Sequence, residues 1–172
     1  MSHSETSLNS SNYHLAVDKI LRILKSGGFW FETFEHDEVR TSEEAAKMRP
    51  EYKLEQGAKA LIVKAYLADS EEKFLMLIMP ADLKLDSKKA CEVLGAKKIR
   101  FVTEDEVSQI TNGVRVGGVP PFGNLFCIKV VADPKLFDNE KIVFNAGDRC
   151  FSIAMKSEDY KAIVTPQIAS IT

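Results

Sequence analysis

The order of apolar and polar positions predicts a chain in which helices and strands are interspersed. Apolar residues recur at helical spacing from Leu15 to Leu24 and a glycine pair follows, which predicts a first helix over residues 13–26. The next segment, FWFETFEH, is aromatic and partly alternating, which is typical of a strand. Thr41 and Glu44 form a capping-box pattern that opens a short helix, and Pro50 ends it.

The clearest hairpin signal lies in the middle of the chain. AKALIVKAYL and KFLMLIMP are rich in aliphatic residues, and the turn-forming segment DSEE separates them. Asp86 is placed to cap a helix over residues 87–94 that Gly95 ends, and KKIRFV then predicts a short strand. Thr103 and Glu106 repeat the capping-box pattern before another short helix, which stops at Asn112.

The last third of the chain predicts mainly strands. VRV and NLFCIKVV are typical of strands, and the segment GGVPPFG joins them. A turn follows at Asp133-Pro134. KIVFNAG and CFSIAM then predict two more strands before a short helix from Ser157. The pattern lacks regular β-α-β alternation, so we expect an α+β fold with a mixed, mostly antiparallel sheet. Length favours one domain over residues 13–172, after a disordered polar N-terminus at residues 1–12.

Composition is that of a globular protein without a membrane segment. Of the 172 residues, 45% are hydrophobic and 28% charged, no apolar run approaches the roughly 20 residues that cross a bilayer, and the Ser-rich start is unlike a secretory signal. We therefore expect a cytoplasmic protein with no membrane partner. A net charge of −2 argues against broad coating of duplex nucleic acid, but not against a pocket for an RNA end.

The usual catalytic motifs are missing from the sequence. Its three cysteines are widely spaced and odd in number, which argues against a disulfide framework or a paired-cysteine zinc site, and we expect Cys91 and Cys127 to be small buried residues. Its three histidines do not form a metal-binding spacing such as HExxH, and neither a GxSxG nor a phosphate-binding glycine motif occurs. We therefore expect no metal and no cofactor.

Two lysines interrupt the first strand of the predicted hairpin. Lys59 and Lys64 are five residues apart, so their side chains lie on opposite faces of a strand. Burying an unpaired ammonium group is costly, so the inward lysine would face a wet cavity or an anion. Alternatively, the strand lies at a sheet edge, where lysines discourage aggregation.

The segment Gly117–Gly123, GGVPPFG, also allows two interpretations. It could be a rigid turn or bulge. Alternatively, its glycines let a ligand approach the backbone while its prolines hold the loop open, so that backbone groups bind a carbonyl, a phosphate or a water.

Three motifs together resemble a known family. GAKALIVK, then GGVPPFG about sixty residues later, then NAGDRCFSI resemble in order and spacing the YbaK and prolyl-tRNA-synthetase-associated editing domains, which hydrolyse mischarged aminoacyl-tRNA. The resemblance covers about residues 28–163. It implies a partly open, mixed β-barrel flanked by helices.

The resemblance also implies roles for residues of these motifs. Lys59 takes the place of the family's lysine, which lies beside the terminal adenosine and is required for deacylation, and Gly117 and Pro121 are the ends of its GxxxP motif. The N–H groups of Gly117 and Gly118 would stabilise the carbonyl. Pro120 stands where the family often has a small residue. The expected substrate-binding residues are Pro120, Pro121, Phe122, Asn145, Ala146 and Gly147.

The expected function is trans-editing deacylation of mischarged tRNA, with tRNA for proline carrying alanine, cysteine, serine or threonine as the substrate. The expected partners are the tRNA acceptor end and, in addition, prolyl-tRNA synthetase. The alternative is a non-catalytic tRNA-binding or appended domain of a prolyl-tRNA synthetase. The lysine-rich segment from Lys84 to Arg100 either guides the acceptor stem or is a solvated surface.

Overall fold

The computed structural model describes residues 12–172, so all of the predicted disordered segment except Asn12 lies outside the described residues. The α-helices are α1 (Leu15–Ser26), α2 (Ser42–Met48), α3 (Ser87–Leu94), α4 (Glu104–Thr111) and α5 (Ser157–Val164). The strands are β1 (Phe31–Glu35), β2 (Ala58–Leu67), β3 (Glu72–Pro80), β4 (Ala96–Phe101), β5 (Lys129–Ala132), β6 (Lys141–Asp148), β7 (Phe151–Lys156) and β8 (Gln167–Ile168). Short 3-10 helices are η2 (Leu54–Gln56), η3 (Gly123–Phe126) and η4 (Pro134–Asp138).

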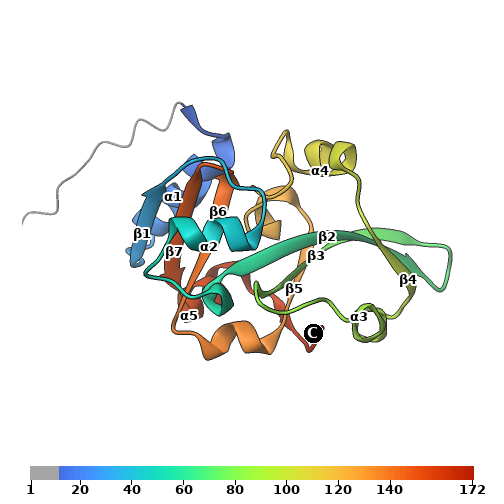
Figure 1. The fold of residues 1–172 in the computed structure, drawn as a ribbon. Coiled ribbons are helices and arrows are strands. Elements are labelled where there is room, and N and C mark those ends of the chain that lie inside the picture. Colours follow the sequence, from blue (N-terminus) through green and yellow to red (C-terminus); the bar gives the residue numbers. More distant parts are fainter. Residues whose placement is uncertain (1–11) are drawn as a thin grey trace, which may run out of the picture.

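The strands form two sheets (Figure 1). The smaller sheet has the order β1-β7-β6 and is antiparallel throughout. The larger has the order β4-β2-β3-β5-β8; β2 pairs antiparallel with β3 and β4, whereas β3, β5 and β8 pair in parallel. The predicted α+β class with a mixed, mostly antiparallel arrangement is confirmed, and the two sheets of the described residues form no closed barrel, consistent with a partly open one.

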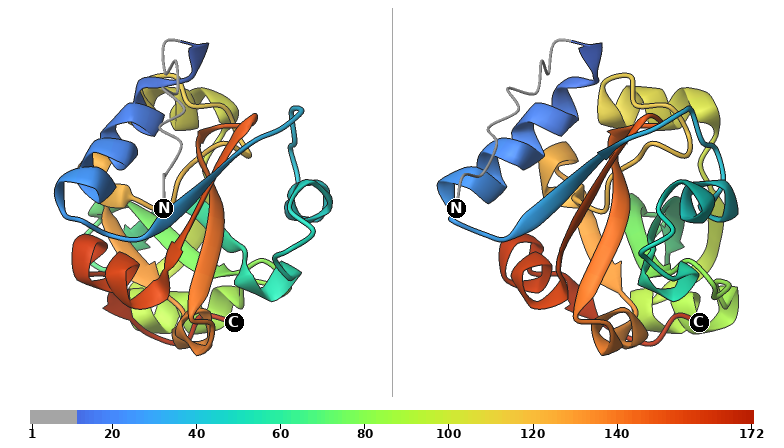
Figure 2. Two further views of the ribbon diagram at one scale, coloured as in Figure 1. Left: turned by 90° about the vertical axis from the view of Figure 1, so that its left-hand side faces the viewer. Right: turned by 60° about the vertical axis from the view of Figure 1, so that its left-hand side comes forward.

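Two large apolar clusters hold the sheets and helices together. The larger lies between the inner faces of both sheets and is covered by α1 and α5; it includes Ile20 of α1, Met76 of β3 and Ile153 of β7, all fully buried. The smaller packs the other face of the large sheet under α3. A third, small cluster lies on the outer face of the small sheet and consists of Tyr52, Val143 and Ala154. Figure 2 shows the small sheet between α1 on one side and α2 on the other. None of the helices in residues 12–172 has the length and apolarity needed to cross a bilayer.

Most of the predicted helix boundaries and the hairpin are confirmed. The Thr41 side chain accepts a hydrogen bond from the Glu44 N–H at the start of α2, and Thr103 does the same with Glu106 at α4. The predicted hairpin is β2-β3, with Ala58 opposite Pro80 and Tyr66 opposite Glu72. These local signals need only neighbours in sequence, which explains why the sequence reveals them.

The predicted strand VRV before GGVPPFG is wrong, and of the strand predicted over NLFCIKVV only residues 129–131 are confirmed, as part of β5. Residues 114–122 form turns and irregular loop, Gly123–Phe126 is the 3-10 helix η3, and the strand β5 begins only at Lys129. Cys127 ends η3 in the left-handed region at φ 56° and is exposed, so the expectation that it is buried in an apolar strand is also wrong. A residue with positive φ cannot continue a strand, and nothing in the side-chain pattern signals it.

Candidate active site

A cavity of about 330 Å³ lies between the two sheets and the segment that contains α2 and η2. One wall is the beginning of β2, and a second is the outer face of the small sheet, at Val143 to Asn145 of β6. The segment between Arg40 and Leu54 covers it, and the loop at Val116 and Gly117 closes one end. In Figure 1, α2 lies in front of β6 and β7 of the small sheet, and β2 begins below it. Segments distant in sequence therefore meet at one concave site.

Lys59 lines this cavity because the first half of β2 has a free edge. β4 pairs with β2 only from Val63 to Leu67, whereas β3 pairs with β2 from its first residue. The ammonium group of Lys59 donates a 2.8 Å hydrogen bond to the backbone carbonyl of Leu83. Burial lowers the pKa of Lys59, although the nearby Glu43 carboxylate partly opposes this effect. The group is thus a half-buried donor facing the cavity.

Lys64 has a different environment. It forms an ion pair with Glu72 and lies near the rings of Tyr66 and Phe74, so its charge is balanced on the sheet surface. Lys59 therefore faces a cavity, as the first interpretation expected. Lys64 is a paired surface lysine in the part of β2 that β3 and β4 flank, so the sheet-edge interpretation does not apply to it.

Arg49 lines the cavity with a guanidinium group that is almost completely buried. Only 4% of the residue is exposed, and burial lowers its pKa to about 10. Its Nε donates to the Ala45 carbonyl over 3.1 Å and its Nη1 to the Ser152 hydroxyl over 3.2 Å. Neither acceptor is charged, so the group remains a cation without an ion-pair partner within residues 12–172.

The cavity carries an excess of positive charge. Four cationic side chains line it, and Glu43 is the one carboxylate among the described lining residues; the cations are Arg40, Arg49, Lys53 and Lys59. The protein as a whole has a net charge of −2. The positive charge is therefore concentrated at the site, which favours an anionic ligand there.

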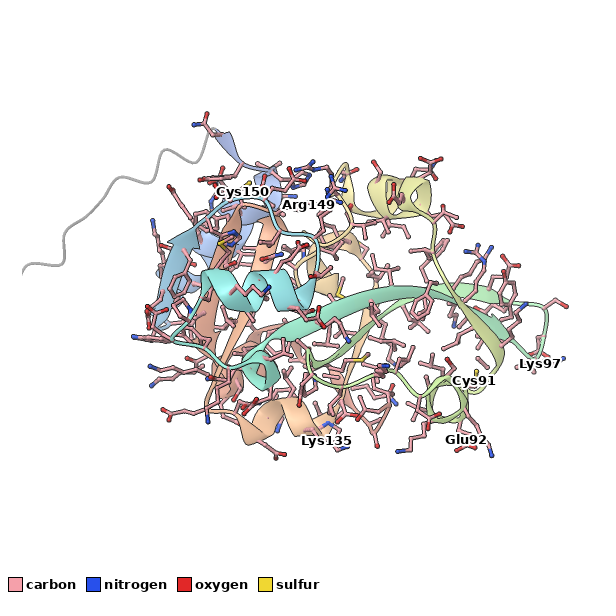
Figure 3. The ribbon with its side chains drawn as sticks, in the orientation of Figure 1. Cys91, Glu92, Lys97, Lys135, Arg149 and Cys150 are labelled. Atoms are coloured by element: carbon pink, nitrogen blue, oxygen red, sulfur yellow. The ribbon has the colours of Figure 1, made fainter. Side chains whose placement is uncertain are left out.

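The loop at Gly117 is fixed to the β6-β7 hairpin by three hydrogen bonds. The Asn145 side-chain amide donates to the Gly117 carbonyl over 2.7 Å, and the Gly147 N–H donates to the Gly118 carbonyl over 2.8 Å. Arg149, labelled in Figure 3, donates from Nε to the Val116 carbonyl over 2.6 Å. These contacts give a structural reason for the two motifs to occur together: the NAG turn holds the glycine pair in place.

The structure brings only part of the predicted site to the cavity. Lys59, Gly117 and Asn145 line it. Six predicted residues do not: Gly118, Pro120, Pro121, Phe122, Ala146 and Gly147. The Gly118 N–H is already donated to the Arg115 carbonyl over 2.9 Å.

The Pro-Pro-Phe part of the loop is a core anchor. Pro120 and Pro121 are buried, and Phe122 is fully buried and packs against the rings of Phe144 and Tyr160. The Tyr160 hydroxyl donates to the Pro121 carbonyl over 2.7 Å. These residues anchor the loop in the core and thereby fix the position of Gly117. The rigid-turn interpretation therefore applies to the second half of the GGVPPFG segment.

Sequence reasoning missed the polar group that lies beside Asn145. The Ser152 hydroxyl is 3.0 Å from Asn145 Oδ1, 3.2 Å from Arg49 Nη1 and 2.6 Å from His36 Nε2. Asn145 and Ser152 are directly paired across β6 and β7, and both point to the side of the sheet that α2 covers. The one sequence signal that could have revealed this group is Ser152 itself, a hydroxyl residue within the otherwise apolar strand CFSIAM.

The described residues contain no grouping of three or more His, Cys, Asp or Glu side chains suited to hold a metal ion. The donors that face the cavity are cationic or amide groups, which bind anions and carbonyl oxygens. The arrangement can therefore hold a ligand that carries phosphate and carbonyl groups.

Comparison with known proteins agrees with this chemistry. Residues 36–163 match the family model described as aminoacyl-tRNA editing domain. The chain is 30% identical over 153 residues to the multifunctional Ser/Thr-tRNA deacylase ProXp-y of Escherichia coli strain K12, covering 88% of this chain and 90% of that protein. It is 25% identical over 139 residues to the prolyl-tRNA editing protein ProX of Acetoanaerobium sticklandii, covering 78% and 81% of the two chains.

Solved structures have the same fold. A candidate trans-editing enzyme for prolyl-tRNA synthetase superimposes with a TM-score of 0.76 at 21% identity, covering 92% of this chain and 98% of that one. A scaffold protein used for computational epitope grafting superimposes with a TM-score of 0.77 at 20% identity, covering 92% and 97%.

Proposed function

Because the chain belongs to the aminoacyl-tRNA editing domain family, we propose that it is a trans-editing deacylase that hydrolyses the ester bond of mischarged aminoacyl-tRNA. One observation carries the proposal: the cavity that Lys59 lines is bordered by the Gly117 loop and has four cationic side chains against one carboxylate. The amino acid proposed is serine or threonine, because the relative that is 30% identical is named a Ser/Thr-tRNA deacylase. Alanine and cysteine on tRNA for proline are the other expected substrates.

The size and charge of the cavity suit the end of an acceptor strand. A volume of about 330 Å³ lies at the lower end of the range for small-molecule sites. It favours a small aminoacyl group with its ribose over a base-paired stem. Local cations together with an unpaired, flexible RNA end allow binding by a protein whose net charge is negative.

Most of the lysine-rich segment lies away from the cavity, although Lys84 follows Leu83, which binds Lys59, and its charge adds to burial in lowering the pKa of Lys59. None of Lys84, Lys88, Lys89, Lys97 and Lys98 lines the cavity, and all are exposed. Arg100 is bound to Glu106 by two hydrogen bonds of 2.7 and 2.8 Å. Figure 3 places Lys97 at the end of the molecule away from Arg149 and the Gly117 loop. We therefore assign these lysines to the solvated surface.

The reaction does not need a nucleophilic side chain of the protein. A water oxygen attacks the ester carbonyl carbon, and the carbonyl π pair moves to oxygen as a tetrahedral intermediate forms. The intermediate collapses, the bond from carbon to the ribose oxygen breaks, and that oxygen takes a proton that the attacking water released. The products are tRNA with a free terminal hydroxyl and an amino acid carboxylate, and the second proton of the water passes to the solvent.

In this reaction Lys59 acts as a point charge for the terminal phosphate or ribose. The Gly117 N–H has no acceptor among the described residues, so we assign it as a backbone donor to the substrate, and Asn145 holds that loop. Association with prolyl-tRNA synthetase and a cytoplasmic location belong to this proposal. Nothing in the site favours the non-catalytic alternative.

The test is deacylation of a panel of purified aminoacyl-tRNAs. tRNA for proline is charged with serine, threonine, alanine, cysteine or proline, and release of the amino acid is followed over time against a reaction without protein. We expect hydrolysis of at least one mischarged ester and none of the correctly charged prolyl ester. A protein that binds these tRNAs but hydrolyses none of them would support the non-catalytic alternative instead.

A further inference from the structure

Arg49 is the feature of the cavity that the proposed function does not yet explain. Arg49 is only 4% exposed and has no carboxylate partner in residues 12–172, and such a buried cation is unfavourable for the folded protein. The Ala45 carbonyl and the Ser152 hydroxyl satisfy only two of its five N–H donors. Such a group needs an anion to balance it, and the protein itself supplies none here.

The remaining donors face the cavity. Nη2 makes no hydrogen bond within the described residues, yet every fully buried side-chain nitrogen or oxygen among them has a partner. Nη2 is therefore not fully buried. Because Arg49 lines the cavity and only 4% of the residue is exposed, the accessible part of the guanidinium is its cavity side.

The orientation of Arg49 is fixed by groups of the same site. The guanidinium donates to Ser152, which is hydrogen-bonded to Asn145, and Asn145 in turn holds the Gly117 carbonyl. Arg49 and the Gly117 loop are thus joined through two side chains. Such a connected network limits movement of both donors before the substrate arrives.

We infer that the guanidinium of Arg49 binds the oxyanion that develops on the ester carbonyl oxygen during hydrolysis. This inference rests on the proposed function. The ester is neutral and carries a cationic α-amino group in the ground state, so it gives the buried cation no partner. When water adds to the carbonyl carbon, the π pair becomes a full negative charge on oxygen, and only then is Arg49 paired.

Arg49 and Lys59 then have different roles. Lys59 is a compact charge suited to a phosphate or ribose that is present throughout the reaction. Arg49 stabilises a charge that exists only near the transition state, which raises the rate of the chemical step without tighter substrate binding. Loss of Arg49 should therefore lower kcat, whereas KM should stay nearly constant.

The experiment compares two analogues of the seryl ester of the terminal adenosine. In one, an amide replaces the ester and leaves the carbonyl neutral; in the other, an anionic phosphonate replaces the carbonyl and imitates the tetrahedral intermediate. Affinities are measured by isothermal titration for wild type, Arg49→Met and the control Arg22→Met, which removes an exposed arginine of α1.

We expect Arg49→Met to weaken phosphonate binding by about 100- to 1000-fold, the loss typical of one oxyanion donor, and to change amide binding by less than about threefold. Arg22→Met should change neither. Equal weakening of both analogues by Arg49→Met would show a role in shaping the cavity and would overturn the inference. If wild type binds neither analogue, the proposed function itself fails.

A second variant covers the case in which Arg49→Met does not fold. Arg49→Lys keeps the charge but removes the planar arrangement that reaches Ser152 and the cavity together. It should fold and weaken the phosphonate more than the amide. Unchanged phosphonate binding in Arg49→Lys, with kcat also unchanged, would contradict the assignment.

Discussion

Substitution of Gly117 by alanine should damage both stability and activity. Gly117 has φ 88°, where an L-residue is strained by about 1–2 kcal/mol. A Cβ atom there would also lie 2.8 Å from the Arg40 carbonyl oxygen and 3.2 Å from Arg40 Cα. Both are backbone atoms, so no flexible side chain can move aside, and we add about 1–3 kcal/mol for the overpacking. The total loss is about 2–5 kcal/mol.

Gly113→Ala is the matched control, because it separates strain from collision. Gly113 has φ 95°, and a Cβ atom there meets nothing within 4 Å. It should lose only the strain of about 1–2 kcal/mol. At about 2–4 °C per kcal/mol for a chain of this size, the Tm of Gly117→Ala should lie several degrees below that of Gly113→Ala.

Activity should separate the two variants further. The collision moves Arg40 and the Gly117 loop, both of which line the cavity, and a displacement near 1 Å in a catalytic site can cost about 100-fold. We expect at least a tenfold loss of kcat/KM for Gly117→Ala and less than about a twofold change for Gly113→Ala in a deacylation assay. Equal stability and equal activity of the two variants would refute the reasoning that the loop is closely fitted to Arg40.

Three other predictions concern charged groups. Lys59→Ala should fold with an unchanged circular dichroism spectrum but lose hydrolysis by at least about 100-fold, since its half-buried ammonium group lines the cavity; retained activity would remove it from the site. Lys53→Gln should raise KM and reduce its dependence on salt, whereas Lys88→Gln, on the exposed face of α3, should not; equal effects would show that the whole surface attracts tRNA. Burial alone raises the pKa of Asp133, but hydrogen bonds from the last residues of the chain outweigh it, so the folded pKa lies below the unfolded value of about 3.9. The stability it contributes is present above that value and is lost as pH falls through the folded pKa, so Tm should fall more steeply below about pH 4 in wild type than in Asp133→Asn; parallel Tm profiles would contradict this assignment.

The sequence predicts the parts of the fold that depend on neighbouring residues. Thr103 and Glu106 cap their own helix, and the β2-β3 hairpin needs only its two alternating strands. The Gly117 segment is different, because its backbone hydrogen bonds go to Asn145, Gly147 and Arg149 about thirty residues later. The glycines and prolines of this segment alone suggest a turn between two strands. Only the hydrogen bonds to the β6-β7 hairpin show that it is a fixed loop.

The same distinction applies to the site. Lys59 could be proposed from a costly position in a strand and from the family motifs, and the cavity beside it agrees with that proposal. Arg49 could not, because an arginine that ends a short helix usually is a solvated C-terminal charge. Its burial results from the segment after α2, which packs through Tyr52 on the outer face of the small sheet and lets Arg49 donate to Ser152, 103 residues later. That pairing is invisible without the fold.

The most direct test of the central claim is a crystal structure of the protein with the seryl-amide analogue of the terminal adenosine. We expect the analogue to occupy the cavity between α2, β2 and the Gly117 loop, with its neutral carbonyl oxygen at the Gly117 N–H and its ribose or phosphate at Lys59. An analogue bound on another surface, with this cavity empty, would contradict the claim that mischarged esters are hydrolysed here.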